Sequence, residues 1–78
     1  MILTPAQCRA ARGLVDWSQD QLANNAGVGN STVRDFEKGR RVPLDENLAA
    51  IRRALEGAGV ELIPAKSGKG VGVRLRNG

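Results

Sequence analysis

The sequence predicts a mainly α-helical domain of four helices that ends in a C-terminal β-hairpin. Two capping boxes mark helix starts, because Thr4 and Ser18 are each followed three residues later by glutamine. Apolar residues then recur at helical spacing, and after Gly59 the pattern changes to the alternation typical of strands. With 78 residues, 41% hydrophobic and 26% charged, the chain has the size and composition of one small globular domain.

The first helix begins after Thr4, its expected N-cap. Pro5 suits the first helical position, and Gln7 completes the capping box. A narrow apolar stripe with one arginine beside it then predicts the buried face, formed by Cys8, Ala11, Arg12 and Val15.

Cys8 is expected to be an ordinary core residue. It is the only cysteine and the chain has no histidine, so neither an intramolecular disulfide nor a cysteine–histidine metal site can form. A redox or nucleophilic role would need a neighbouring base, which the sequence does not supply. The glycines around Lys69 also do not complete a phosphate-binding loop. We therefore expect neither an enzyme nor a protein that holds a cofactor or a metal.

The second helix is predicted to begin after Ser18, where Trp17 can pack on Leu22 as a hydrophobic staple. It should end at Gly27, because glycine adopts the left-handed backbone most easily. A third helix, residues 30–38, follows at once. Val33 and Phe36 share its apolar side, and polar residues occupy the other side, namely Asn30, Ser31, Arg34 and Asp35.

A basic segment follows the third helix and contains Lys38, Arg40 and Arg41. Asp45 is then the expected cap of a fourth helix, whose core stripe is Leu48, Ile51 and Leu55 and which ends within residues 57–59. Arg52 and Arg53 lie on its outer side and are expected to be solvated or locally paired.

The C-terminal residues predict two strands, 60–63 and 71–75, joined by the turn-rich residues 64–70. We therefore divide the chain into a helical domain, residues 1–58, and a hairpin extension, residues 59–78. A lone hairpin is marginal in water, so it should fold onto the fourth helix or pair with a second subunit. The alternative is a partly disordered basic arm carrying Lys66, Lys69, Arg74 and Arg76.

The second and third helices resemble the helix-turn-helix of the Cro/C1 (Xre-like) family of phage and bacterial DNA-binding regulators. The residues that carry the resemblance are Gln19, Leu22, Ala23, Gly27, Val28, Thr32, Val33 and Glu37. The family has a small residue at the Ala23 position, a glycine in the turn and a branched apolar residue at the Val33 position. Gly29 departs from it, because serine or threonine usually caps the third helix there. The resemblance covers residues 4–57 and implies a four-helix Cro/C1-like (lambda repressor-like) domain with its helix-turn-helix at 18–39.

The resemblance implies that the third helix, residues 30–38, lies in the major groove of DNA. The expected base-reading residues are Asn30, Ser31, Arg34 and Asp35. Asparagine can read adenine and arginine can read guanine, while Asp35 can accept from cytosine or orient Arg34. The expected phosphate contacts are Gln19, Thr32, Lys38, Arg40 and Arg41. The alternative for the basic segment is a solvated run of charges.

The resemblance also implies that Arg12 pairs with Glu37 at the end of the third helix. A buried pair of this kind adds little net stability, but removing one partner leaves an uncompensated charge. The alternative is that both residues are solvated surface charges.

The expected function is a sequence-specific double-stranded DNA-binding transcriptional regulator, such as a repressor, acting as a homodimer on an inverted repeat. The net charge of +4 agrees with an anionic partner. We expect no small-molecule effector, no membrane segment and a cytoplasmic, bacterial or phage-type location on the nucleoid. The alternatives are a DNA-binding antitoxin, or a helix-turn-helix interaction module whose hairpin binds a protein partner.

Overall fold

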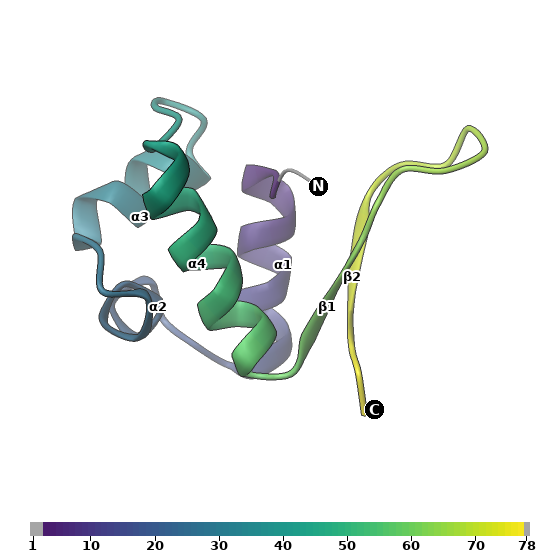
Figure 1. The fold of residues 1–78 in the computed structure, drawn as a ribbon, viewed down its shortest axis with the longest axis horizontal. Coiled ribbons are helices and arrows are strands. Elements are labelled where there is room, and N and C mark those ends of the chain that lie inside the picture. Colours follow the sequence, from purple (N-terminus) through teal and green to yellow (C-terminus); the bar gives the residue numbers. More distant parts are fainter. Residues whose placement is uncertain (1–2, 78) are drawn as a thin grey trace.

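The computed structural model describes residues 3–77, and it has four helices followed by a two-stranded antiparallel hairpin (Figure 1). The elements in chain order are α1 (Pro5–Val15), α2 (Gln19–Ala26), α3 (Asn30–Glu37), α4 (Asp45–Gly57), β1 (Val60–Ile63) and β2 (Gly72–Leu75). The predicted fold class, mainly helical with a C-terminal hairpin, is confirmed.

The first two helices begin with complete capping boxes. Thr4 Oγ1 accepts from the Gln7 backbone N–H at 3.0 Å, and Gln7 Oε1 accepts from the Thr4 N–H at 3.0 Å. Ser18 and Gln21 make the same two bonds at 3.1 and 2.8 Å. α2 ends as expected at Gly27, whose φ of 71° is left-handed. Local sequence therefore sets the boundaries of α1 and α2.

The start of α4 differs from the prediction that Asp45 caps it. The Leu44 carbonyl already accepts from the backbone N–H groups of Asn47 and Leu48, both at 2.9 Å, so Leu44 is the N-cap. Asp45 and Glu46 instead occupy the first turn. There their carboxylates interact favourably with the positive end of the helix dipole.

A single core joins the helices and the hairpin. Its buried residues are Leu3, Cys8, Ala11, Leu22, Ala23, Val33, Phe36, Ile51, Leu55, Val60 and Leu62. Val60 and Leu62 belong to β1, which packs on α1 and α4. Strand β1 of the hairpin therefore contributes to the same hydrophobic core as the helices.

The hairpin has a paired base and a tight turn at its tip, separated by residues that lie outside both strands. Val60 lies opposite Leu75 and Ile63 opposite Gly72, and Lys66 bridges Lys69 at the tip. The two turn residues, Ser67 and Gly68, have φ of 53° and 79°. Two consecutive positive φ values match the tight turns that suit the twist of a hairpin. Figure 1 shows β2 as the strand farther from α4.

Gln7 connects α1 to both strands. Its side chain is 2% exposed, and its Nε2 donates to the carbonyl oxygens of Ile63 at 3.3 Å and Gly72 at 3.0 Å. The same amide oxygen completes the α1 capping box. The sequence predicted only the capping role, because nothing local to Gln7 indicates that strands some 60 residues later supply carbonyl acceptors.

Gln7→Glu should destabilise the domain by about 1 to 3 kcal/mol at neutral pH. Glutamate keeps the capping box but has no N–H to donate, so it brings a carboxylate against the carbonyls of Ile63 and Gly72. The matched control is Gln21→Glu, the same change in the exposed α2 capping box. Urea unfolding measures both, and equal midpoints would contradict the proposed anchoring role.

Candidate nucleic-acid interface

The helix α3 has one buried face and one polar, accessible face. Val33 and Phe36 are 0% and 3% exposed and belong to the core. The side chains of the opposite face that lie open to solvent are Asn30, Ser31 and Arg34, while Asp35 is half-buried. The structure therefore brings three of the four predicted base-reading residues together on one accessible surface.

Arg34 is held by Asn30. Its Nη2 donates to Asn30 Oδ1 at 2.7 Å, across one helical turn. Asp35 was expected either to accept from cytosine or to orient Arg34, but the side chain that holds Arg34 in the structure is Asn30. The Asn30 side-chain oxygen is already occupied by the Arg34 guanidinium. The hydrogen-bonding groups of the two side chains that remain free for a ligand are therefore mainly N–H donors.

The basic loop, which we define as residues 38–41, leaves the end of α3 in a fixed direction. Gly39 has a φ of 74°, and its N–H donates to the Phe36 carbonyl at 3.0 Å. The Arg40 N–H donates to the Asp35 carbonyl at 2.9 Å. Lys38, Arg40 and Arg41 are all exposed. The loop therefore presents three cations next to the polar face of α3.

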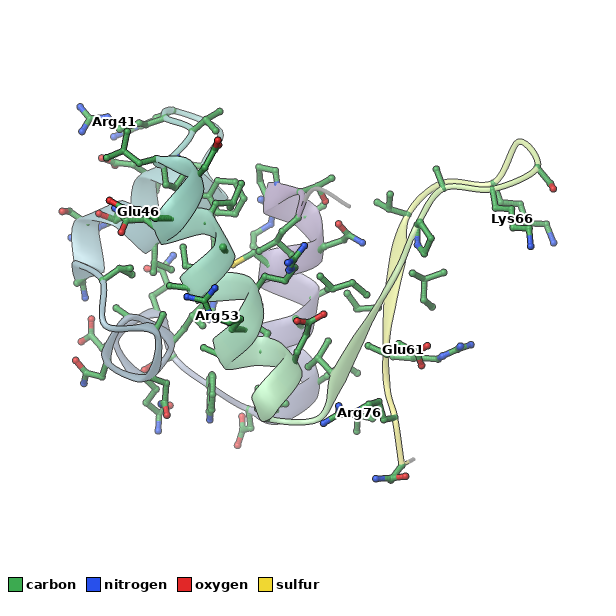
Figure 2. All side chains as sticks on the ribbon, in the orientation of Figure 1. Arg41, Glu46, Arg53, Glu61, Lys66 and Arg76 are labelled. Atoms are coloured by element: carbon green, nitrogen blue, oxygen red, sulfur yellow. The ribbon has the colours of Figure 1, made fainter. Side chains whose placement is uncertain are left out.

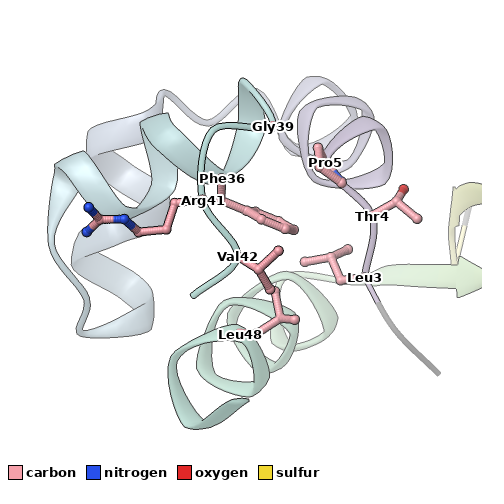
Figure 3. Close-up of a pocket in the computed structure, with 8 residues that line it drawn as sticks. All are labelled: Leu3, Thr4, Pro5, Phe36, Gly39, Arg41, Val42 and Leu48. Carbon is pink, nitrogen blue, oxygen red and sulfur yellow. The ribbon is translucent and has the colours of Figure 1, made fainter. Parts of the chain in front are cut away.

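Beneath the basic loop lies an open apolar pocket of about 270 Å³. Its lining includes Leu3, Phe36, Val42 and Leu48, from both ends of the helical domain (Figure 3). The guanidinium of Arg41 points away from these apolar side chains in Figure 3. Apolar side chains thus line the inner side of the loop, while the charge of Arg41 faces away from them.

A buried ion pair links α1 to the end of α3. Arg12 Nε lies 2.7 Å from Glu37 Oε2, and Arg12 Nη2 donates to Glu37 Oε1 at 2.8 Å. Gln19 Nε2 donates to Glu37 Oε1 at 3.0 Å, and Cys8 Sγ donates to Oε2 at 3.1 Å. The Glu37 side chain is only 2% exposed. We call these four residues the Glu37 cluster, and it joins α1, α2 and α3.

The Glu37 cluster stabilises the ionised carboxylate. Burial raises the pKa of Glu37, but hydrogen bonds from Arg12, Gln19 and Cys8 and the charge of Arg12 outweigh it, so the pKa lies below the ordinary 4.5. Burial also raises the pKa of Cys8, and its bond to Glu37 raises it further. The thiol is therefore protonated and donates to Glu37, which suits a core residue and leaves no reactive thiolate.

Gln19 has a structural role that its sequence position did not predict. We predicted a phosphate contact for it, and its amide nitrogen donates to Glu37. An amide nitrogen carries two hydrogens, so a phosphate contact would use the second one. Gln19 is also the first residue of α2, where backbone N–H groups lack helical partners. The bond from Gln19 to Glu37 could be predicted only from the tertiary structure, because it depends on the end of α3 packing against α2.

Thr32 and Gly29 lie at the start of α3. Thr32 is half-buried, and Gly29 is the N-cap without a side-chain cap bond, in agreement with the predicted departure. A Cβ at Gly29 would meet Thr32 Oγ1 at 3.6 Å, an ordinary contact distance. The site therefore has space for the serine or threonine that is more usual here.

Between residues 3 and 77, no group of histidine, cysteine and acidic residues could hold a metal ion. No helix among these described residues is both long and apolar enough to cross a membrane.

Comparison with known proteins agrees with this geometry. Residues 9–62 match the model of the helix-turn-helix family. The matched segment covers more than half of the chain and includes all of α2 and α3. No curated protein gave a significant match to the chain. With the four helices, the glycine turn and the polar face of α3 in place, the chain belongs to the Cro/C1-type helix-turn-helix family of DNA-binding regulators.

Proposed function

We propose that the protein is a sequence-specific transcriptional regulator that inserts α3 into the major groove of double-stranded DNA. The observation that carries this proposal is the continuous surface formed by the polar face of α3 and the basic loop. A buried apolar face and the Glu37 cluster hold this surface rigidly against the domain. Rigid elements position base-reading side chains more accurately than mobile loops do.

In this proposal, Asn30 and Arg34 read bases as a unit. Their 2.7 Å contact directs N–H donors toward the groove, and guanine offers two acceptors there, N7 and O6. Ser31 supplies a further donor or acceptor one residue along. Asp35 can accept from the amino group of cytosine. The expected operator therefore contains a guanine opposite Arg34.

The proposed phosphate contacts surround the base-reading residues. Lys38, Arg40 and Arg41 follow the DNA backbone beyond the end of α3, and their charge gives affinity that falls with salt. Thr32 and the second amide hydrogen of Gln19 contact phosphates near the starts of α3 and α2. These contacts fix the position of the protein on DNA without selecting a sequence.

A single recognition helix reads only a few base pairs, so we propose that two copies bind an inverted repeat. Half-sites would then lie about 34 Å apart, one turn of the double helix. Whether bound protein represses or activates depends on where the operator lies relative to the promoter.

Arg34→Ala should weaken binding to the selected operator by about 1 to 3 kcal/mol and relax the preference at one base pair of each half-site. Arg41→Ala should instead weaken binding to all sequences alike and reduce the salt dependence. Arg53, exposed on α4 away from the basic loop, supplies the matched control Arg53→Ala (Figure 2). Binding is measured by selecting genomic fragments and titrating them at several salt concentrations.

Equal effects of Arg34→Ala and Arg41→Ala on selected and random DNA would contradict this division between base and phosphate contacts. If the wild-type protein bound no DNA with sequence preference at any salt concentration, the proposed function itself would be wrong.

A further inference from the structure

The carbonyl groups in the last turn of α3 all have hydrogen-bond partners. A helix by itself leaves its last four carbonyls unpaired. Three of those in α3 accept from backbone N–H groups of the basic loop, in the pairs Lys38 to Arg34, Gly39 to Phe36 and Arg40 to Asp35, at 3.1, 3.0 and 2.9 Å. The fourth carbonyl, that of Glu37, accepts from the side chain of Arg9, whose Nη1 is the donor. Arg9 therefore completes the C-terminal cap of the recognition helix.

The bond from Arg9 differs from the other three because it joins two elements. The three backbone bonds link α3 to its own continuation, so they do not depend on the rest of the domain. Arg9 belongs to α1, which packs on α3. Its bond therefore fixes the peptide group between Glu37 and Lys38, where the basic loop begins, relative to the body of the domain.

Glu37 is held through both its side chain and its backbone. Arg12 binds the carboxylate at 2.7 and 2.8 Å, and Arg9, three residues earlier on α1, binds the carbonyl. Residues three apart lie on the same side of a helix, so both arginines reach the end of α3 together. Unlike the buried Glu37 carboxylate, the Arg9 side chain is exposed. Its removal therefore leaves no charge stranded in the core.

The chain that follows Glu37 has little packing of its own. All five residues from 38 to 42 are exposed, and the chain is next buried at Pro43. The inner side of this segment faces the open pocket of about 270 Å³. A segment without buried side chains is held mainly at its ends. The direction of the basic loop therefore depends on how firmly Glu37 is fixed at one end and Pro43 at the other.

We propose that Arg9 is a positioning residue for DNA binding, because its bond to the Glu37 carbonyl holds the basic loop in the direction that meets the DNA backbone. Arg9 acts through the cations of the loop and not on bases, so it supports the affinity for all sequences alike. A loop held in place before binding loses less conformational freedom when it meets DNA. The inference rests on the function proposed above and adds a residue of α1 to the site.

The mobility of the loop in the free protein tests this role without DNA. Arg9→Met removes the donor, and the backbone order parameters of residues 38–41 should fall from about 0.85 toward the values below about 0.6 that mark flexible segments. Arg9→Lys keeps a charged donor and should stay near the wild type. Nitrogen-15 relaxation measures the order parameters of the folded protein, so a general loss of stability does not lower them. Unchanged values in Arg9→Met would overturn the proposal.

DNA binding provides the second test. Arg9→Met should weaken binding to the selected operator and to random DNA alike, by about tenfold. Arg53→Met removes the same charge from an exposed side chain of α4 and is the matched control. In an Arg41→Ala background, Arg9→Met should cost only about threefold, because one of the cations that it positions is already absent. Additive effects of the two substitutions would mean that Arg9 does not act through the loop, and would overturn the proposal.

The two measurements separate this inference from the proposed function. If the wild-type protein bound its operator while Arg9→Met kept both the order of the loop and the affinity, the role of Arg9 alone would be wrong. If the wild-type protein bound no DNA with sequence preference, the proposed function would be wrong, even where Arg9→Met lowered the order of the loop as expected.

Discussion

Glu37→Ala is expected to destabilise the domain by about 3 to 5 kcal/mol, a large share of the roughly 5 to 10 kcal/mol typical of this size. Removing the carboxylate leaves the Arg12 guanidinium partly buried without its counter-charge. It also leaves the inward-facing donors of Gln19 and Cys8 without their acceptor. The loss should exceed that of an ordinary ion pair, because the cluster joins three helices.

Urea unfolding followed by the fluorescence of Trp17, the only tryptophan, measures this effect. The matched control is Glu61→Ala, which removes the carboxylate of another doubly hydrogen-bonded arginine pair, with Arg74, on the exposed hairpin. A small effect is expected there, because solvent screens exposed pairs. If both variants unfolded at the same urea concentration, burial of the Glu37 cluster would not be the source of its importance.

Acid provides an independent measure of the same cluster. The folded state holds the pKa of Glu37 below the unfolded value of 4.5, so it binds this proton less readily than the unfolded chain. The contribution of Glu37 is therefore fully present above about pH 4.5 and is lost as the pH falls through the lower folded pKa. When the pH is lowered from 6 to below 4.5, the free energy of unfolding should fall more for the wild type than for Glu37→Ala.

Leu22→Ala should cost about 2 to 5 kcal/mol and weaken DNA binding at temperatures where the variant partly unfolds. Leu22 is 0% exposed, and α2 packs on both α3 and α4, so its removal leaves a cavity behind the recognition helix. Thermal and urea unfolding measure the stability. Binding at low temperature, where the fold is retained, should stay close to that of the wild type.

Leu44→Ala is the matched control for Leu22, because the same atoms are removed from a side chain that is 70% exposed. Its effect should remain within about 0.5 kcal/mol. Comparable losses from the two substitutions would mean that burial at Leu22 does not govern the stability of the helix-turn-helix.

Local signals in the sequence were sufficient for most of the fold. The capping boxes at Thr4 and Ser18 and the glycine at 27 each act over a single turn, so their effect can be read without knowing the tertiary structure. The start of α4 was misplaced because Leu44 caps it through its backbone alone. A backbone cap leaves no trace in the side-chain pattern.

The side-chain contacts of the candidate site were less predictable, because they depend on how helices pack. Helical spacing was enough to predict which side chains share the polar face of α3. The orientation of Arg34 did not, since Asn30 and Asp35 were both within reach. The inward bond of Gln19 requires the end of α3 to lie beside the start of α2. Such a relation arises only once the helices have docked.

The contacts of Gln7 have a consequence for the order of folding. Its amide group binds carbonyls 56 and 65 residues later in the chain, so the helices can form early, but the α1 amide exchanges water for these acceptors only when both strands have docked. A fragment that stops after α4 would leave this polar group without its acceptors and would also lack Val60 and Leu62. Closure of the hairpin on α1 is therefore a late, long-range step that couples the stability of the helices to the C-terminal strands.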